Sequence, residues 1–131
     1  MATLTPSLSL VSTDSTSDAL SFTVTDAIAI GANQVRTTTI YSPNDLDPGG
    51  PKIFDNALGK SFIYAKNTHA TLQIYLVLTA TEAVDGDVYM HLSPGEFAFF
   101  PWAGIQDLFA HTGANGQGIA TNGLEVMIFE V

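Results

Sequence analysis

Short apolar segments between closely spaced turn signals are the feature that most restricts how this chain folds. Pro94-Gly95, Asn115-Gly116 and Asn122-Gly123 are dipeptides typical of turns, because glycine and asparagine accept positive φ. Between such signals lie alternating segments, of which LSFTVT (residues 20–25) is the clearest. Alternation with a period of two predicts strands, and no long stretch shows the helical period of about 3.6 residues. Turn signals recur about every 8–12 residues, which predicts an all-β fold.

We expect about eight to ten strands, packed as two sheets in a β-sandwich of jelly-roll type. Pro101 is expected to end one strand, and Asn67 another. Residues 42–52, rich in proline, glycine and aspartate, are expected to form a loop, and residues 53–58 a short helical turn or irregular chain. The strands are expected at residues 20–25, 34–41, 61–67, 71–78, 88–92, 96–100, 105–111 and 124–131.

The chain of 131 residues fits one domain, preceded by a segment of different composition. In residues 1–18, Leu4, Leu8 and Leu10 alternate with serine, threonine and proline, which suits an extended N-terminal arm. A frayed terminus is the alternative. We therefore divide the chain into an arm, residues 1–18, and a single β-sandwich domain, residues 19–131.

Charge restricts the classes of partner. The net charge is −9, and the four lysine and arginine residues are scattered along the chain. Because phosphate-binding surfaces need clustered cations, we expect no nucleic-acid partner and no anionic membrane surface. No apolar run reaches the roughly 18–20 residues of a membrane helix. The absence of cysteine excludes disulfides, thiolate catalysis and zinc sites built from cysteine.

The segment HLSPGEFAFFPW, residues 91–102, is the best candidate for a site. A Pro-Gly turn, an acidic residue and an apolar strand resemble part of the pattern of cupins, small jelly rolls that often bind a metal. The histidines that the cupin pattern requires are missing around this turn. The simpler interpretation places Phe97 and Phe99 in the core. Phe100 and Trp102 are then covered by a second sheet, or they form an exposed patch at an interface.

Other candidate ligands fit no known pattern. His69, His91 and His111 are about twenty residues apart, which matches no local zinc motif, although His91 and His111 are close enough to strand ends to meet across strands. Asp45 with Asp47, and Asp85 with Asp87, form Asp-X-Asp pairs that suit Ca²⁺ but equally serve as turn residues. We therefore expect no catalytic residue, no metal and no cofactor.

The second half of the chain resembles small virion proteins of tailed bacteriophages. SFIYAKNTHATLQIYL (residues 61–76), LSPGEFAFFPW (residues 92–102) and the terminal LEVMIFEV are similar, in this order, to the recurring segments of those proteins. The resemblance implies a jelly-roll protein on the surface of a capsid, fibre or tail, often a trimer, without catalytic residues.

From the resemblance we expect a non-enzymatic capsid decoration or cement protein. It would be made in the host cytoplasm, located on the virion, and bound as a homotrimer to the major capsid protein or another virion protein. The alternatives are a fibre or tail module that binds glycans, with Trp102, Gln106 and Asp107 as its site, and a cupin-like metal enzyme. Candidate interface residues are Leu4, Leu8, Leu10, Phe100, Trp102, Met127 and Phe129.

Overall fold

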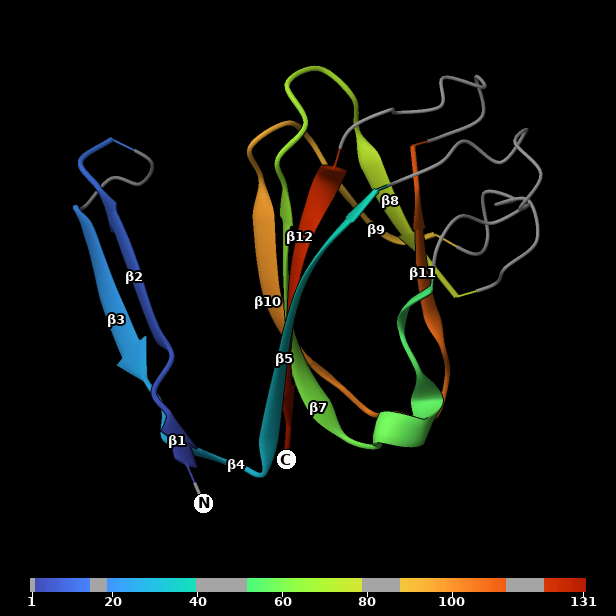
Figure 1. The fold of residues 1–131 in the computed structure, drawn as a ribbon. Coiled ribbons are helices and arrows are strands. Elements are labelled where there is room, and N and C mark those ends of the chain that lie inside the picture. Colours follow the sequence, from blue (N-terminus) through green and yellow to red (C-terminus); the bar gives the residue numbers. More distant parts are fainter. Residues whose placement is uncertain (1, 15–18, 40–51, 79–87, 113–121) are drawn as a thin grey trace.

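The protein is an all-β chain whose main body is a β-sandwich of two four-stranded sheets (Figure 1). The computed structural model describes residues 2–14, 19–39, 52–78, 88–112 and 122–131. Residues 42–51 of the expected loop, the turn expected at Asn115-Gly116, and both Asp-X-Asp pairs lie outside these residues, whereas Lys52, the last residue of the expected loop, is part of a strand.

The first sheet, sheet 1, has the strand order β10-β7-β12-β5, and all its neighbours are antiparallel. Its long central strand, β12, lies between β7 and β5. The strands are β5 (Ala32–Thr39), β7 (Ser61–Asn67), β10 (Phe97–Trp102) and β12 (Asn122–Glu130).

The second sheet, sheet 2, has the order β6-β11-β8-β9 and is also antiparallel. A 3-10 helix, η1 (Asn56–Leu58), follows its first strand, so the expected helical turn in residues 53–58 is confirmed in part. The strands are β6 (Lys52–Phe54), β8 (Ile74–Val77), β9 (Val88–Leu92) and β11 (Leu108–His111).

The core lies between the two sheets. In β7, residues at every second position from Ser61 to Asn67 are buried, while Phe62, Tyr64 and Lys66 lie on the partly exposed outer side. The core cluster takes aliphatic residues from six strands and three aromatic rings: Ile53, Phe54, Ile63, Ala65, Ile74, Leu76, Leu92, Phe100, Trp102, Leu108, Ala110, Leu124, Val126 and Ile128. Their burial is the main force that holds the two sheets together.

The Pro-Gly turn connects the sheets. Glu96 N donates to Ser93 O at 2.9 Å across Pro94-Gly95, and Gly95 has φ +83°, as the third position of a type II turn requires. The Glu96 carboxylate accepts a hydrogen bond from Ser93 N at 2.7 Å. This acidic residue, which looked like part of a site, therefore closes a turn.

Asn67 fastens the same corner from inside. Its side chain is fully buried, and its amide donates to Leu72 O at 2.8 Å and to Leu92 O at 2.9 Å. Its carbonyl oxygen accepts from His69 N at 2.9 Å. Because every polar atom of this amide is satisfied, the residue ties β7 of sheet 1 to the end of β9 in sheet 2.

Three expectations about strands are wrong. Pro101 does not end its strand: β10 continues to Trp102, with Pro101 opposite Phe62. A proline is accommodated here because β10 is an edge strand. Asn122-Gly123 begins β12 rather than turning a hairpin, with a register shift between Asn122 and Leu124 that marks a bulge. The strand expected from residue 105 begins at Leu108.

The faces of β10 are the reverse of the expected ones. Phe97 and Phe99 are 64% and 38% exposed, whereas Phe100 and Trp102 are only 8% and 9% exposed. Edge-to-face ring contacts with Phe54 in β6 cover Trp102, and Tyr89 in β9 contacts both buried rings. A second sheet therefore covers Phe100 and Trp102, which is the first of the two alternatives stated for them, and they do not form an exposed patch.

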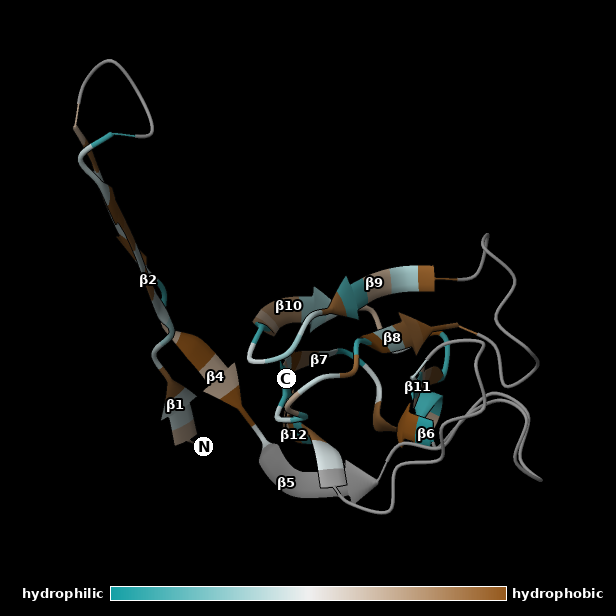
Figure 2. Ribbon diagram, turned by 90° about the horizontal axis from the view of Figure 1, so that it is seen from above, coloured by the Kyte–Doolittle hydropathy of each residue, from teal (hydrophilic) through white to brown (hydrophobic). Residues whose placement is uncertain are grey.

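The N-terminal segment is a strand pair that projects from the sandwich (Figures 1 and 2). β2 (Ser7–Ser12) pairs with β3 (Leu20–Thr25), and β1 (Ala2–Leu4) pairs with β4 (Ile28–Ile30) at the root. We call β2 and β3 the N-terminal ribbon. Because the pairing crosses the boundary placed between residues 18 and 19, the projecting unit comprises residues from Ala2 to Ile30.

Candidate functional site

The N-terminal ribbon has one apolar face and one mainly polar face, on which Val11 is 73% exposed. Cross-strand register places Leu8 opposite Val24 and Leu10 opposite Phe22, so these four side chains share a face. All four are between 46% and 49% exposed. On the other face, Thr23 Oγ1 donates to Ser9 Oγ at 3.4 Å and Thr25 Oγ1 to Ser7 Oγ at 3.2 Å. The ribbon thus exposes a continuous apolar stripe.

A second apolar surface lies on the outer side of sheet 1. Phe62 and Phe99 stack with ring centroids 5.6 Å apart, and Tyr64 and Phe97 contact each other at 6.1 Å. We define the aromatic face as Phe62, Tyr64, Phe97, Phe99, Met127 and Phe129. The register explains the set, because Met127 lies opposite Tyr64 and Phe129 opposite Phe62. Period-two alternation in β7, β10 and β12 puts all six on the side away from the core.

A groove of about 730 Å³ separates the N-terminal ribbon from the aromatic face. Its walls come from the root and base of the ribbon on one side and from three strands of sheet 1 on the other. The lining residues are Leu4, Pro6, Ser7, Leu8, Ser9, Val24, Asp26, Ile28, Phe62, Tyr64, Phe97, Ala98, Phe99, Pro101, Met127 and Phe129. Asp26 is the one charged residue among them. The groove is therefore suited to an apolar occupant.

The expected interface residues separate into two groups. Leu4, Leu8, Met127 and Phe129 line the groove, and Leu10 lies on the apolar face of the ribbon. Phe100 and Trp102 are instead part of the core.

The remaining residues of the groove and of the ribbon's apolar face were not predicted as interface residues from the sequence. They are Phe22 and Val24 on the ribbon and Phe62, Tyr64, Phe97 and Phe99 on sheet 1. Two signals pointed to them. SFIYAKN carries large apolar residues on both faces, and the alternating leucines of residues 7–12 match the alternation of residues 20–25 across a turn-rich segment.

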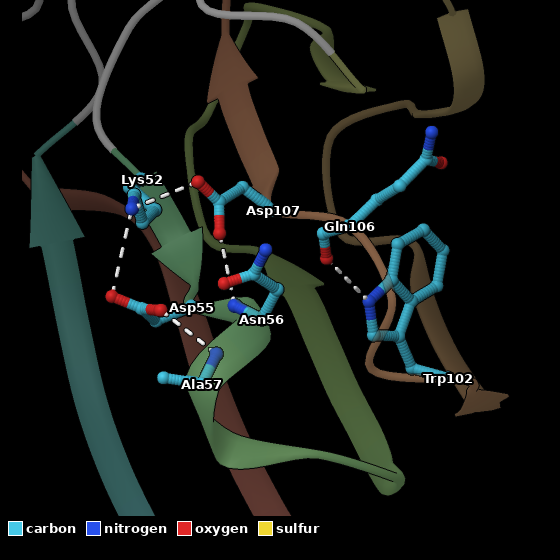
Figure 3. Close-up of polar contacts among 7 residues, drawn as sticks. All are labelled: Lys52, Asp55, Asn56, Ala57, Trp102, Gln106 and Asp107. Atoms are coloured by element: carbon cyan, nitrogen blue, oxygen red, sulfur yellow. Dashed lines mark hydrogen bonds and ion pairs between the residues drawn. The ribbon is translucent and has the colours of Figure 1, made fainter.

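The expected sugar site is a structural cluster (Figure 3). Trp102 is buried, and its Nε1 donates to Gln106 O at 3.1 Å, so its ring is not available as a stacking surface. Asp107 accepts from Asn56 N at 2.9 Å and pairs with Lys52 Nζ at 2.9 Å. Asp55, which is 3.5 Å from Lys52, also caps η1 by accepting from Ala57 N.

Electrostatics agrees with that structural role. The hydrogen bond from the Lys52 ammonium, together with the one from the Asn56 backbone, holds the pKa of Asp107 below its usual range. The hydrogen bond to Asp107 in turn raises the pKa of Lys52. Both groups thus stay charged near neutral pH and fasten β6 to the start of β11. The exposed setting makes this a weak bond rather than a reactive one.

The histidines are also integrated into the fold. His91 and His111 meet at the same side chain: Tyr75 lies between them, with ring centroids 6.1 Å from His91 and 5.4 Å from His111. Burial lowers the pKa of His111. His69 Nδ1 accepts backbone hydrogen bonds from Thr71 and Leu72 at 3.1 and 3.0 Å.

Within the described residues, no group of three or more potential metal ligands comes together. The same residues contain no helix of the length and apolarity that a membrane span needs.

No protein-family model, curated protein or solved structure matches this chain. The resemblance to virion proteins therefore stays a prediction from the sequence, and the groove and ribbon are interpreted on their physical properties.

Proposed function

We propose that this protein is a non-enzymatic structural protein of a tailed-phage virion, of the capsid decoration or cement type. One observation carries the proposal: a closed sandwich bears a projecting ribbon whose apolar side chains are about half exposed. Exposed apolar surface of this extent, next to an apolar groove, is typical of proteins that assemble with other protein chains.

The strand order supports the jelly-roll part of the proposal. From β5 to β12 the chain passes from one sheet to the other at every step except from β8 to β9, which pair with each other in sheet 2: β5, β7, β10 and β12 lie in sheet 1, and β6, β8, β9 and β11 in sheet 2. The last strand lies beside the first in sheet 1, and β11 lies beside β6 in sheet 2. We assign this nested pairing of early with late strands to a jelly roll, the fold expected for many capsid-associated proteins.

The proposed assembly is a homotrimer on the outer surface of the phage head, made in the host cytoplasm and attached to the major capsid protein or another virion protein. Its role there is mechanical, since each bound trimer links capsid subunits across their junctions. The net charge of −9 keeps free subunits apart in solution at long range.

Co-sedimentation with empty heads of the cognate phage tests this function. We expect the protein to pellet with heads and to saturate at a fixed ratio to the major capsid protein. Protein spun without heads provides the control for self-aggregation. A protein that remains in the supernatant at every concentration, or that binds heads without saturation, would exclude a decoration role.

The fibre or tail alternative remains the second candidate, but its glycan site loses its stacking residue. Because Trp102 is 9% exposed and its indole N–H is already bonded, a sugar ring cannot stack on it. We therefore favour protein assembly over glycan binding.

A further inference from the structure

We propose that the groove of one copy of this chain is filled by the N-terminal ribbon of a second copy. The proposal deepens the proposed function, on whose oligomeric state it rests, by naming the two surfaces that join the subunits. The ribbon contributes the apolar face formed by Leu8, Leu10, Phe22 and Val24, and the recipient contributes the aromatic face of sheet 1.

The ribbon needs a cover to hold its structure. A lone two-stranded hairpin is at best marginally stable in water, and its register is well specified only when one face is buried. Here all twelve positions of β2 and β3 except Ser12 are classed as exposed. Each copy of the chain has one ribbon and one groove. A second copy can therefore cover the ribbon of the first, with as many grooves as ribbons.

The distribution of charge favours a copy over a foreign partner. The chain has 13 acidic and 4 basic residues, so two copies repel each other at long range, and acidic groups within their contact surfaces would add to this repulsion. The sequences of β2 and β3, SLSLVS and LSFTVT, contain no charged residue. The groove lining has one, Asp26. A cationic partner would instead need an acidic surface, and neither of these two surfaces is acidic.

The root of the ribbon prevents closure within one chain. β1 pairs with β4 from Ala2 and Ile30 to Leu4 and Ile28, and Asp26 N donates to Pro6 O at 3.2 Å, so the direction of the ribbon is fixed where it leaves the sandwich. Swinging it onto its own aromatic face would break these hydrogen bonds. A ribbon arriving from another copy reaches the groove without breaking any.

The contact is directional, because the ribbon of one copy and the groove of another are different surfaces. Heterologous contacts close into a ring when the rotation between successive copies closes, and a threefold rotation gives the proposed trimer.

Solution mass by light scattering tests the proposal through matched substitutions. Phe22→Asp places a charge on the apolar face, whereas Thr23→Asp places the same charge on the adjacent residue of the polar face, which is also exposed. We expect the wild type and Thr23→Asp to be oligomeric, and Phe22→Asp to dissociate at least about 100-fold more readily, because a charge in an apolar contact is left unpaired. Phe99→Asp in the groove should have the same effect. A monomeric wild type, or equal behaviour of Phe22→Asp and Thr23→Asp, would overturn the proposal.

Cross-linking between copies tests directly whether the ribbon of one copy contacts the groove of another. It needs no charged substitution, which could itself unfold the ribbon. Since the chain has no cysteine, Leu10→Cys and isotope-labelled Phe99→Cys can be mixed and treated with a short bis-maleimide. We expect mixed pairs, identified by mass spectrometry, and far fewer when Thr23→Cys, on the polar face, replaces Leu10→Cys. Equal yields from positions 23 and 10 would contradict insertion of the apolar face.

Neither experiment uses phage heads, so each proposal fails separately. An oligomeric protein that does not bind heads would exclude the decoration role but would agree with the insertion of the ribbon into a second copy. A monomeric protein that saturates heads would exclude the insertion but would agree with the decoration role.

Discussion

At Gly104, on the connection between β10 and β11, a side chain has no room. Its φ is +75°, and a Cβ built there would overlap the backbone of Gly59, which follows η1. Gly95 offers a comparison, because its φ is +83° but nothing lies within 4 Å of a Cβ. A substitution at Gly95 thus tests backbone strain alone, whereas a substitution at Gly104 tests strain together with steric overlap.

We expect Gly104→Ala to lower the free energy of unfolding by about 3 kcal/mol, from strain and overlap together. Gly95→Ala should cost about 1–2 kcal/mol, from strain alone. Urea denaturation followed by tryptophan fluorescence measures both, since Trp102 is buried nearby. Equal losses for the two substitutions would mean that the backbone at Gly59 yields without cost.

His111 makes stability depend on pH. Burial lowers its pKa in the folded protein below the ordinary value of about 6.5, so the unfolded chain binds the proton first as the pH falls. Folding stability should therefore decline from pH 7 toward pH 5. His111→Phe, which keeps a ring against Tyr75, should flatten this decline, whereas His91→Phe retains His111 and the slope. Urea midpoints across this range provide the measurement, and a wild-type midpoint that rises on acidification would refute the assignment.

At the scale of elements, we expect the sandwich to fold without the projecting unit, residues 2–30. The core cluster begins at Ile53 and takes no residue from the first four strands. We expect a version lacking residues 2–30 to stay soluble and to unfold in one cooperative transition, as measured by circular dichroism.

Removing residues 2–18 alone should be worse than removing the whole unit. It deletes β1 and β2 and leaves β3, with Phe22 and Val24, without its partner strand. Such an unpaired apolar strand promotes aggregation, which light scattering detects. If the protein with the shorter deletion is as soluble as the one with the longer deletion, the unpaired β3 does not promote aggregation.

The elements of the sandwich were largely predictable because their signals are local. LSFTVT, SFIYAKN and the Pro94-Gly95 turn form what their patterns indicate. The facing of β10 was not predictable, since FAFFPW has large apolar residues at both parities and only the opposing sheet decides which side is buried. The groove was not predicted for a similar reason. It depends on where the paired residues 7–12 and 20–25 lie relative to sheet 1, and the local sequence pattern does not specify that placement.

At the scale of the whole molecule, the structure combines a tightly packed interior with apolar surfaces that its own chain leaves open. The interior uses inward aromatic residues such as Phe54 and Trp102, whereas Phe97 and Phe99 on the outer side pack with only partial cover. That division was hidden in the sequence, where inward and outward aromatic residues look alike. The outward aromatic residues, which the chain itself covers only in part, are the reason for proposing a role in assembly.

Pro101 in the edge strand β10 has a consequence for how such an assembly can grow. A proline is tolerated in an edge strand because its nitrogen faces away from the ladder, where it has no hydrogen to offer to an incoming strand. Sheet 1 is thus protected at this edge against lengthening by further strands, the route by which exposed β-sheets polymerise into amyloid-like fibrils. A blocked edge at β10 therefore removes one route by which subunits that meet through their faces could also polymerise without limit.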